Sequence, residues 1–338
     1  MTATQLQPWH AAPLSQVRSA WDGDRLPHAI LLHGAEGLDK SGFAAWLAQA
    51  VLCDTPGSPL APCDNCASCT LVQAGSHPDL TRVVPPPDKQ NILIDQIRAA
   101  CEQLALTSYR QGRKVAIVEP AHRMTVAAAN SLLKTLEEPT PRTHLLLVTS
   151  QPASLPATIR SRCLRLGFRP PEREVALAWL REHVGSDVDP VILEFAGGAP
   201  VAARALAEGA FADLDERMRR GLSELIAGRI DVSVLASEWA ARDLEARLKW
   251  LEFWCSREIR TQMCGTAEQV TLAGSVQPLP SRGPALNISS LYGLFDAIRE
   301  LRLVLSRTAL QKELAIESVL IRLLRSIGPA ASRPTGQR

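Results

Sequence analysis

The chain has 338 residues, of which 46% are hydrophobic, 21% are charged and 4% are aromatic. This length predicts two or three domains, and the composition excludes a disordered chain, a collagen-like chain and a small disulfide scaffold. Lys and Arg total 37 against 35 Asp and Glu, a formal charge of +2, so the net charge gives no reason to expect binding to nucleic acid or an acidic membrane.

No uninterrupted apolar stretch reaches the ~18 residues that cross a bilayer, and residues 1–10 lack the basic and apolar regions of a signal peptide. We therefore expect a cytoplasmic protein. In that reducing compartment the eight cysteines are more readily metal ligands, reactive thiols or small buried side chains than disulfides.

The first 168 residues alternate short aliphatic runs with longer amphipathic segments, which is typical of βα units that build a parallel sheet. The strands of such a sheet are buried on both faces and are therefore apolar along their length. Five runs fit this description: 29–32, 80–84, 115–118, 145–148 and 162–166. The helices expected between them are 41–52, 92–104 and 126–138, the last with Thr125 as N-cap and Pro139 as its end.

The pattern changes at residues 168–171, where two prolines cannot continue a sheet ladder. A small helical segment follows, and from about residue 210 apolar side chains recur at the spacing of buried helix faces. Within this region, 265–284 is expected to be a long loop. The predicted division is an α/β domain at 1–168, a small helical lid domain at 169–209, a helical domain at 210–328 and a disordered tail at 329–338.

A phosphate-binding loop pattern follows the first predicted strand. Residues 34–41 match G-x-x-x-x-G-K-[S/T] at every specified position except the second glycine, which is Asp39. In a working loop Lys40 and Ser41 serve the terminal phosphates and Mg²⁺. Asp39 brings a Cβ and a negative charge to that place, and repulsion at ~4 Å costs roughly 1 to 4 kcal/mol. We expect this loop, with Gly34 and Gly37, to bind phosphate poorly.

The second nucleotide element is expected at the end of a later strand, where acidic residues hold Mg²⁺ and activate water. Glu119 follows the strand 115–118, but Pro120 occupies the place of the second, catalytic acid. Two defects in one site favour the loss of ATP hydrolysis, and an unusual but working ATPase is the alternative.

Four cysteines lie between the first helix and the second strand: Cys53, Cys63, Cys66 and Cys69. Two-residue spacers let consecutive cysteines wrap one ion, and four thiolates complete a tetrahedral Zn²⁺ site. Because sulfur fills every position, the predicted zinc is structural. The alternative is a group of free or redox-active cysteines.

Two basic features are harder to interpret from the sequence. Arg110, Arg113 and Lys114 form the densest basic cluster of the first domain, and they are either a contact for a DNA backbone or a solvated surface. Arg162 lies in the polar stretch Ser161-Arg162-Cys163, and an arginine in such a loop is usually solvated.

These elements, in this order, resemble the delta-prime subunits of the bacterial DNA polymerase III clamp loader, members of the AAA+ superfamily. The most specific parts are residues 130–139 (Asn-Ser-Leu-Leu-Lys-Thr-Leu-Glu-Glu-Pro), the four-cysteine insertion and Ser161-Arg162-Cys163. The resemblance covers the first domain and, more loosely, the helical domains. It implies an AAA+ P-loop-type α/β domain with a zinc insertion at 53–69, a helical lid and a C-terminal collar through which subunits oligomerise.

The resemblance also implies roles for individual residues. Arg162 resembles the arginine finger that reaches the ATP site of a neighbouring motor subunit, and Thr149 resembles the first sensor residue at the end of the fourth strand. Val201 stands where motor subunits carry a second sensor arginine. The implied partners are gamma or tau motor subunits and the clamp-opening delta subunit, and through the assembly the sliding clamp and primed DNA.

Clamp loaders are hetero-pentamers in which ATP-bound subunits open the clamp, and delta-prime subunits are described as structural partners that do not hydrolyse ATP. An ATP-hydrolysing gamma/tau-type motor subunit is the alternative, but it would need the glycine and the acid that Asp39 and Pro120 replace. A stand-alone zinc-dependent nucleic-acid-binding protein would need a basic surface with aromatic residues. The residues between Cys63 and Cys69 are acidic or small and polar.

Overall fold

The computed structural model describes residues 5–57, 59–109, 112–209, 211–264, 288–305 and 311–327. The loop expected at 265–284, the tail expected at 329–338 and Arg110 lie outside these residues. The chain folds into two compact units, one of Met1–Glu182 with Ala196–Ala203 and one of His183–Phe195 with Arg204–Arg338. The helical segment 169–209 contributes to both units, and the division into three domains stays a prediction.

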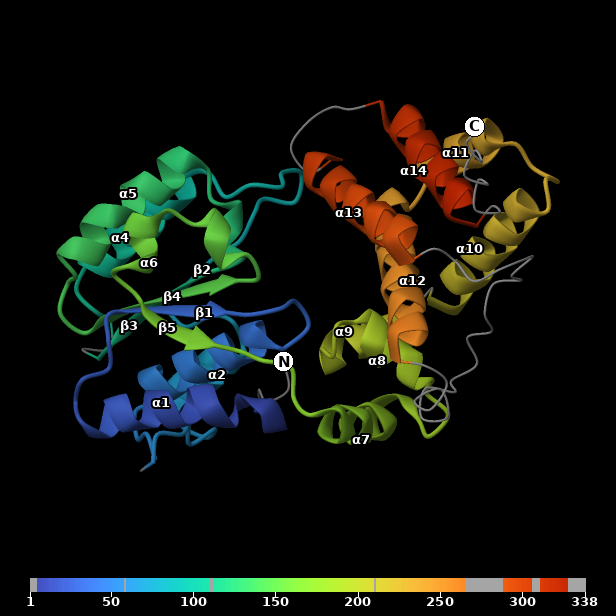
Figure 1. Ribbon diagram of the computed structural model, residues 1–338. Helices are drawn as coiled ribbons and strands as arrows, with labels where there is room; N and C mark the ends of the chain where they lie inside the picture. Colours follow the sequence, from blue (N-terminus) through green and yellow to red (C-terminus); the bar gives the residue numbers. More distant parts are fainter. Residues whose placement is uncertain are drawn as a thin grey trace, which may run out of the picture. The chain divides into compact units, whose positions relative to one another are not determined.

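A five-stranded sheet, parallel throughout, forms the centre of the first unit (Figure 1). Its spatial order is β2-β3-β4-β1-β5, so β1 lies between β4 and β5, and Ile30 pairs with both Leu146 and Leu164. The connection from β1 runs toward β2, and the connection from β4 passes β1 to reach β5, so these neighbouring strands send the chain in opposite directions. The carboxyl ends of β1 and β4 therefore form a switch point, where ligands bind in open α/β sheets. The strands are β1 (Ala29–His33), β2 (Leu80–Val83), β3 (Lys114–Val118), β4 (Thr143–Thr149) and β5 (Leu164–Gly167).

Helices cover both faces of this sheet (Figure 1). Along β1, Ile30 and Leu32 face the core beneath α1 (Ala11–Asp22) and α2 (Lys40–Leu52). Ala29 and Leu31 face the opposite core, beneath α4 (Ile94–Ala105) and α5 (Val126–Glu137). This alternation explains why the strands are apolar at every position.

Three predicted starts were wrong by two residues. Strand β4 begins at Thr143 rather than 145, and the other two differ for a local reason. Helix α4 begins at Ile94 rather than 92, because the Ile92 backbone bonds to Arg123 O (2.8 Å) and Thr125 N (3.1 Å). Strand β5 begins at Leu164 rather than 162, because α6 (Ala157–Arg160) ends in a turn in which Arg162 N donates to Ile159 O (3.1 Å). Arg162 therefore lies outside the sheet.

Helix α5 follows the sequence prediction closely. The Thr125 hydroxyl accepts a hydrogen bond from Ala128 N (3.2 Å), and Glu138 is the C-cap residue before Pro139. The remaining elements before the second helical region are the 3₁₀ helices η1 (Pro8–His10), η2 (Ala121–Arg123) and η3 (Pro152–Ser154), and the helices α3 (Ala67–Gln73), α7 (Arg173–Val184), α8 (Pro190–Phe195) and α9 (Pro200–Ala207).

The C-terminal region is helical, and its core contains the fully buried Trp239 and Trp250. Its helices are α10 (Phe211–Ile226), α11 (Val232–Ala241), α12 (Leu244–Cys264), α13 (Ile288–Leu305) and α14 (Lys312–Ile327). The predicted fold class, an α/β sheet unit followed by a helical region, is confirmed. Across the residues described, no helix combines the length and the apolar character needed to cross a membrane.

Candidate functional site

The predicted nucleotide residues meet at the carboxyl edge of the sheet. The loop 34–39 follows β1, Glu119 follows β3 and Thr149 ends β4. The hydroxyl of Ser41, in the first turn of α2, donates to the Glu119 carboxylate. The fold therefore brings together elements that are 78 residues apart in the sequence.

Asp39 occupies the N-terminus of α2. Its backbone is left-handed (φ 55°, ψ 40°), and its Oδ1 accepts a hydrogen bond from Gly42 N (3.2 Å). Asp adopts this conformation more readily than most residues because its short side chain bonds locally. A Cβ at Gly42 would lie 2.5 Å from both carboxylate oxygens of Asp39. The carboxylate thus covers the positive end of the helix, where a loop of this kind binds phosphate.

Lys40 and Ser41 also have partners within the chain. Lys40 is only 6% exposed, and its Nζ donates to Ala35 O (2.6 Å) in the preceding loop. Burial lowers the pKa of Lys40, while Glu36 and Glu119 raise it. The Gly42 amide, the Lys40 ammonium group and the Ser41 hydroxyl thus each have a hydrogen-bond partner within the protein.

A segment before the sheet fixes the same loop. The carbonyl oxygen of Leu38 lies 2.9 Å from Trp9 Nε1 and 3.1 Å from His10 Nε2. His10 Nδ1 accepts from Gln7 N (3.1 Å), which assigns the proton to Nε2 and makes both contacts to Leu38 O hydrogen bonds. Burial lowers the pKa of His10. The sequence analysis missed Trp9 and His10, and no local pattern connects them to a residue nearly 30 positions away.

Helix α9 closes the other side of the loop. Val201 N, in its first turn, donates to Gly37 O (3.1 Å). Gly37 has φ 79°, and a Cβ there would lie 2.3 Å from Ala202 Cβ, so only glycine fits. Val201, expected at the place of a second sensor, contacts the loop through its backbone amide.

Thr149 is 1% exposed, and its hydroxyl lies 3.0 Å from His122 Nδ1 and accepts from Gln151 N (3.0 Å). The sequence analysis did not select His122. Burial lowers the pKa of His122, as does Arg123, while Glu36 raises it. Thr149 therefore has polar partners in the protein itself.

Arg162 stands apart from these groups, after α6. Its Nη2 lies 2.8 Å from Glu137 Oε1, and its Nη1 donates to Thr158 O (3.0 Å). The side chains of Arg162 and Glu137 are 37% and 52% exposed. The last turn of a helix carries the negative end of the helix dipole, which repels the carboxylate of Glu137. The guanidinium of Arg162 beside it offsets that repulsion. The sequence analysis did not identify Glu137 as a partner of Arg162.

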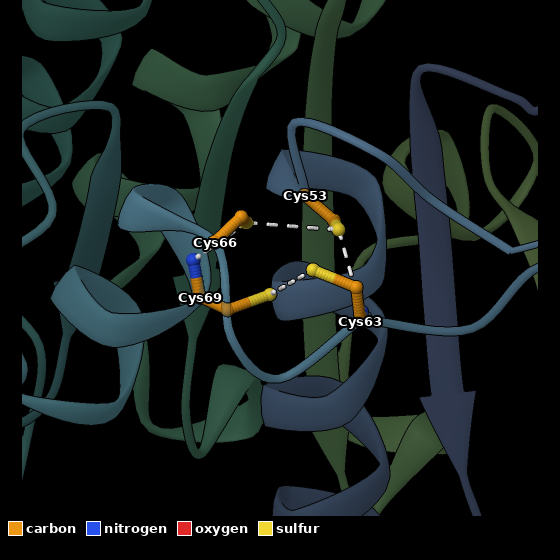
Figure 2. Close-up of side chains that lie close together, drawn as sticks. All are labelled: Cys53, Cys63, Cys66 and Cys69. Carbon is orange, nitrogen blue, oxygen red and sulfur yellow. Dashed lines mark hydrogen bonds between the residues drawn. The ribbon is translucent and has the colours of Figure 1, made fainter.

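The four predicted cysteine ligands converge (Figure 2). Their sulfur atoms all lie within 4.8 Å of one another, with 3.8 Å between those of Cys53 and Cys66 and 4.0 Å between those of Cys63 and Cys69. Tetrahedral Zn–S bonds of about 2.3 Å place sulfurs about 3.8 Å apart. The cluster therefore has the dimensions for binding one metal ion.

Hydrogen bonds support this cluster from outside. Asp54 accepts from the hydroxyl of Ser68 (2.7 Å) and from its backbone amide (3.3 Å), which orients α3. Cys63 N donates to Cys53 Sγ (3.4 Å), as a donor to a metal-bound thiolate would. Burial raises the pKa of Cys69 to about 12. Hydrogen bonds, first among them the one with Thr55, lower the pKa of Cys63 to about 6.

The basic cluster does not form one exposed patch. Lys114 is 6% exposed, and its ammonium group donates to Gln103 O and Leu106 O at the end of α4. Arg113 lies over the ring of Trp21, 4.1 Å from its centre. Both interpretations of Lys114, a DNA contact and a solvated surface, were therefore wrong, because the start of β3 is buried.

Two relatives match this chain along nearly its whole length. The family model described as DNA polymerase III, delta subunit, matches residues 9–172. DNA polymerase III subunit delta' of Pseudomonas aeruginosa is 31% identical over 330 residues, covering 96% of this chain and 99% of that protein. The Escherichia coli subunit delta' is 31% identical over 338 residues, covering 97% and 98%. This chain belongs to the DNA polymerase III delta' family.

More distant matches are partial or low in identity. DNA polymerase III subunit tau of Bacillus subtilis is 34% identical over 146 residues, 43% of this chain and 25% of that protein. A solved gamma subunit-related protein of Thermotoga maritima is 18% identical with a TM-score of 0.43, covering 93% of this chain and 99% of that one. Membership of the delta' family rests on the nearly full-length relatives.

The buried charge of Asp39 predicts a pH-dependent stability. Burial raises its pKa above the ordinary value of 3.8, so the ionised carboxylate lowers stability at neutral pH, and this cost disappears as the pH falls through the raised pKa. Asp39→Asn keeps an oxygen acceptor for Gly42 N without the charge. We expect thermal denaturation at pH 7 to show a gain in stability for Asp39→Asn over the natural chain.

That gain should shrink as the pH falls toward 3.8. A difference between Asp39→Asn and the natural chain that stays constant from pH 7 to pH 4 would contradict a cost that arises from ionisation.

Proposed function

We propose that this chain is a delta' subunit that neither binds ATP productively nor hydrolyses it, and that acts as a structural partner in the DNA polymerase III clamp loader. The observation that carries the proposal is the Asp39 carboxylate on the Gly42 amide, because it occupies the helix N-terminus that a phosphate needs. Pro120, where a catalytic acid is expected, supports the same conclusion.

These features argue against the alternative, an ATP-hydrolysing motor subunit of the same assembly. A motor would need Lys40 and Ser41 free for phosphate and Mg²⁺, whereas both are bonded within the chain. It would also need a loop whose amides face a ligand. The packing of Val201 and Ala202 on Gly37 instead favours a loop with a structural role.

We propose that Arg162 acts in trans as an arginine finger in the ATP site of a neighbouring gamma or tau subunit. Its guanidinium is partly exposed, and Glu137 and Thr158 hold it in a defined position, which supports this role. A guanidinium placed at the transferred phosphoryl group accelerates hydrolysis by roughly 10³ to 10⁵. The proposed assembly includes the delta subunit and acts on the sliding clamp at primed DNA.

The test is Arg162→Ala in the reconstituted clamp loader. We expect the complex to assemble normally while ATP hydrolysis at the adjacent motor site falls by at least about 10³-fold in single-turnover measurements. Arg162→Lys should not restore the rate, because an ammonium lacks the planar fork of a guanidinium. Arg169→Ala, at another exposed arginine seven positions later, is the matched control and should hydrolyse normally.

An unchanged rate at that motor site, in an assembled Arg162→Ala complex, would exclude the finger role. A complex that fails to assemble would instead assign Arg162 to subunit contact, and gel filtration of each variant separates the two results.

We propose that Cys53, Cys63, Cys66 and Cys69 hold a structural Zn²⁺. Four sulfur ligands leave no open coordination position, so the ion would stabilise residues 53–69 and supply no reaction chemistry. We expect about one zinc per chain by elemental analysis of protein purified without chelator. Cys66→Ser should lose the metal, whereas Cys101→Ser, at a cysteine outside the cluster, should retain it. Equal metal contents in these two variants would contradict the assignment.

A further inference from the structure

A polar cavity of about 410 Å³ lies beside the cysteine cluster. Asp79, Arg113 and Arg142, which line it, immediately precede β2, β3 and β4. The cavity is therefore at the amino edge of the sheet, opposite the edge that carries the nucleotide loop. The cysteine module contributes Cys53 and Ser68 to its wall.

Arg113 presents an oriented guanidinium at this cavity. The group is half-buried and lies over the ring of Trp21, 4.1 Å from the ring centre, which restricts its position. Burial lowers the pKa of Arg113, Asp24 raises it, and Arg142 lowers it. In the part of the chain that the structure describes, Arg113 forms no ion pair and donates no hydrogen bond.

Arg142 adds a second guanidinium from a strained backbone. Its φ of 61° is left-handed, a backbone conformation that arginine rarely adopts. A backbone hydrogen bond between the starts of β3 and β4 maintains that conformation, because Lys114 N donates to Arg142 O (2.9 Å). The side chain is exposed and has no ion pair with any described residue. The two guanidinium groups are near enough to repel each other, and the carboxylates around them are those of Asp24, Asp54 and Asp79.

The two acids of the cavity already accept hydrogen bonds from the protein. Asp54 bonds the hydroxyl and amide of Ser68, as described above. Asp79 accepts from the hydroxyl of Ser108 (3.0 Å) and from Tyr109 N (2.9 Å). Both carboxylates therefore position loops around the cavity, and neither forms an ion pair within 4.0 Å with Arg113 or Arg142.

We propose that Arg113 and Arg142 bind a phosphate group in this cavity, carried either by a small phosphate ester or by a nucleic-acid backbone. Guanidinium forks match the oxygens of phosphate and bind them with charge-assisted hydrogen bonds. The volume falls within the range of small-ligand sites. This site would be separate from the nucleotide loop, which lies at the other edge of the sheet.

Calorimetric titration of the full chain at constant ionic strength tests the site, with inorganic phosphate and a twelve-residue oligothymidylate as the two probes. Arg142→Asn should weaken binding at least about tenfold while preserving or raising thermal stability, because Asn tolerates the left-handed backbone. Arg98→Gln, which removes an exposed charge from α4, is the matched control and should bind as the natural chain does.

If inorganic phosphate binds, and Arg142→Asn but not Arg98→Gln weakens it, the ligand is a small phosphate ester. If only oligothymidylate binds, with the same dependence on the two variants, the ligand is a nucleic-acid backbone. Equal binding by Arg142→Asn and the natural chain overturns the proposal, as does the absence of binding of both probes below about 10 mM. The Nε–H resonance of Arg113 gives a readout at the site itself and should shift only when the bound phosphate occupies this cavity.

Discussion

The hydrogen bond from the Gly42 amide to the Asp39 carboxylate places a negative charge of the chain itself at the N-terminus of α2. The first amides of a helix lack partners within the helix and carry its positive end, so they must be bonded by a ligand, water or a side chain. A phosphate-binding loop leaves them for phosphate. Here a residue of the chain itself bonds one of them, and the side chains of Lys40 and Ser41 also have partners within the chain.

The surroundings of the loop are consistent with this change. Trp9 and His10 bond one of its carbonyl groups, and α9 packs against Gly37, so the loop is held from both sides. Arg162 has a different environment, partly exposed and held by Glu137. The Asp39 carboxylate at the helix N-terminus and the partly exposed Arg162 guanidinium are the two features behind our proposal that this chain acts on the ATP of a neighbouring subunit.

Much of this could be predicted from the sequence, for physical reasons. Strands buried on both faces are apolar throughout, Asp39 breaks an otherwise complete loop pattern, and cysteine spacing limits how four thiols can meet. The contacts of Trp9 and Glu137 could not be predicted, because they join residues that only the fold brings together. Lys114 was misjudged for a related reason, since its charge is satisfied by buried carbonyl groups at the end of a distant helix.

An equilibrium titration with ATP and Mg²⁺ of the isolated chain and of Asp39→Gly tests the central claim most directly. Glycine adopts the left-handed backbone without strain and removes the carboxylate from the helix N-terminus. We expect the natural chain to bind no ATP below millimolar concentration and to release no phosphate, and Asp39→Gly to bind ATP more tightly. Micromolar ATP binding by the natural chain, with a turnover that Lys40→Ala abolishes, would contradict this and would identify a motor subunit with an unusual loop.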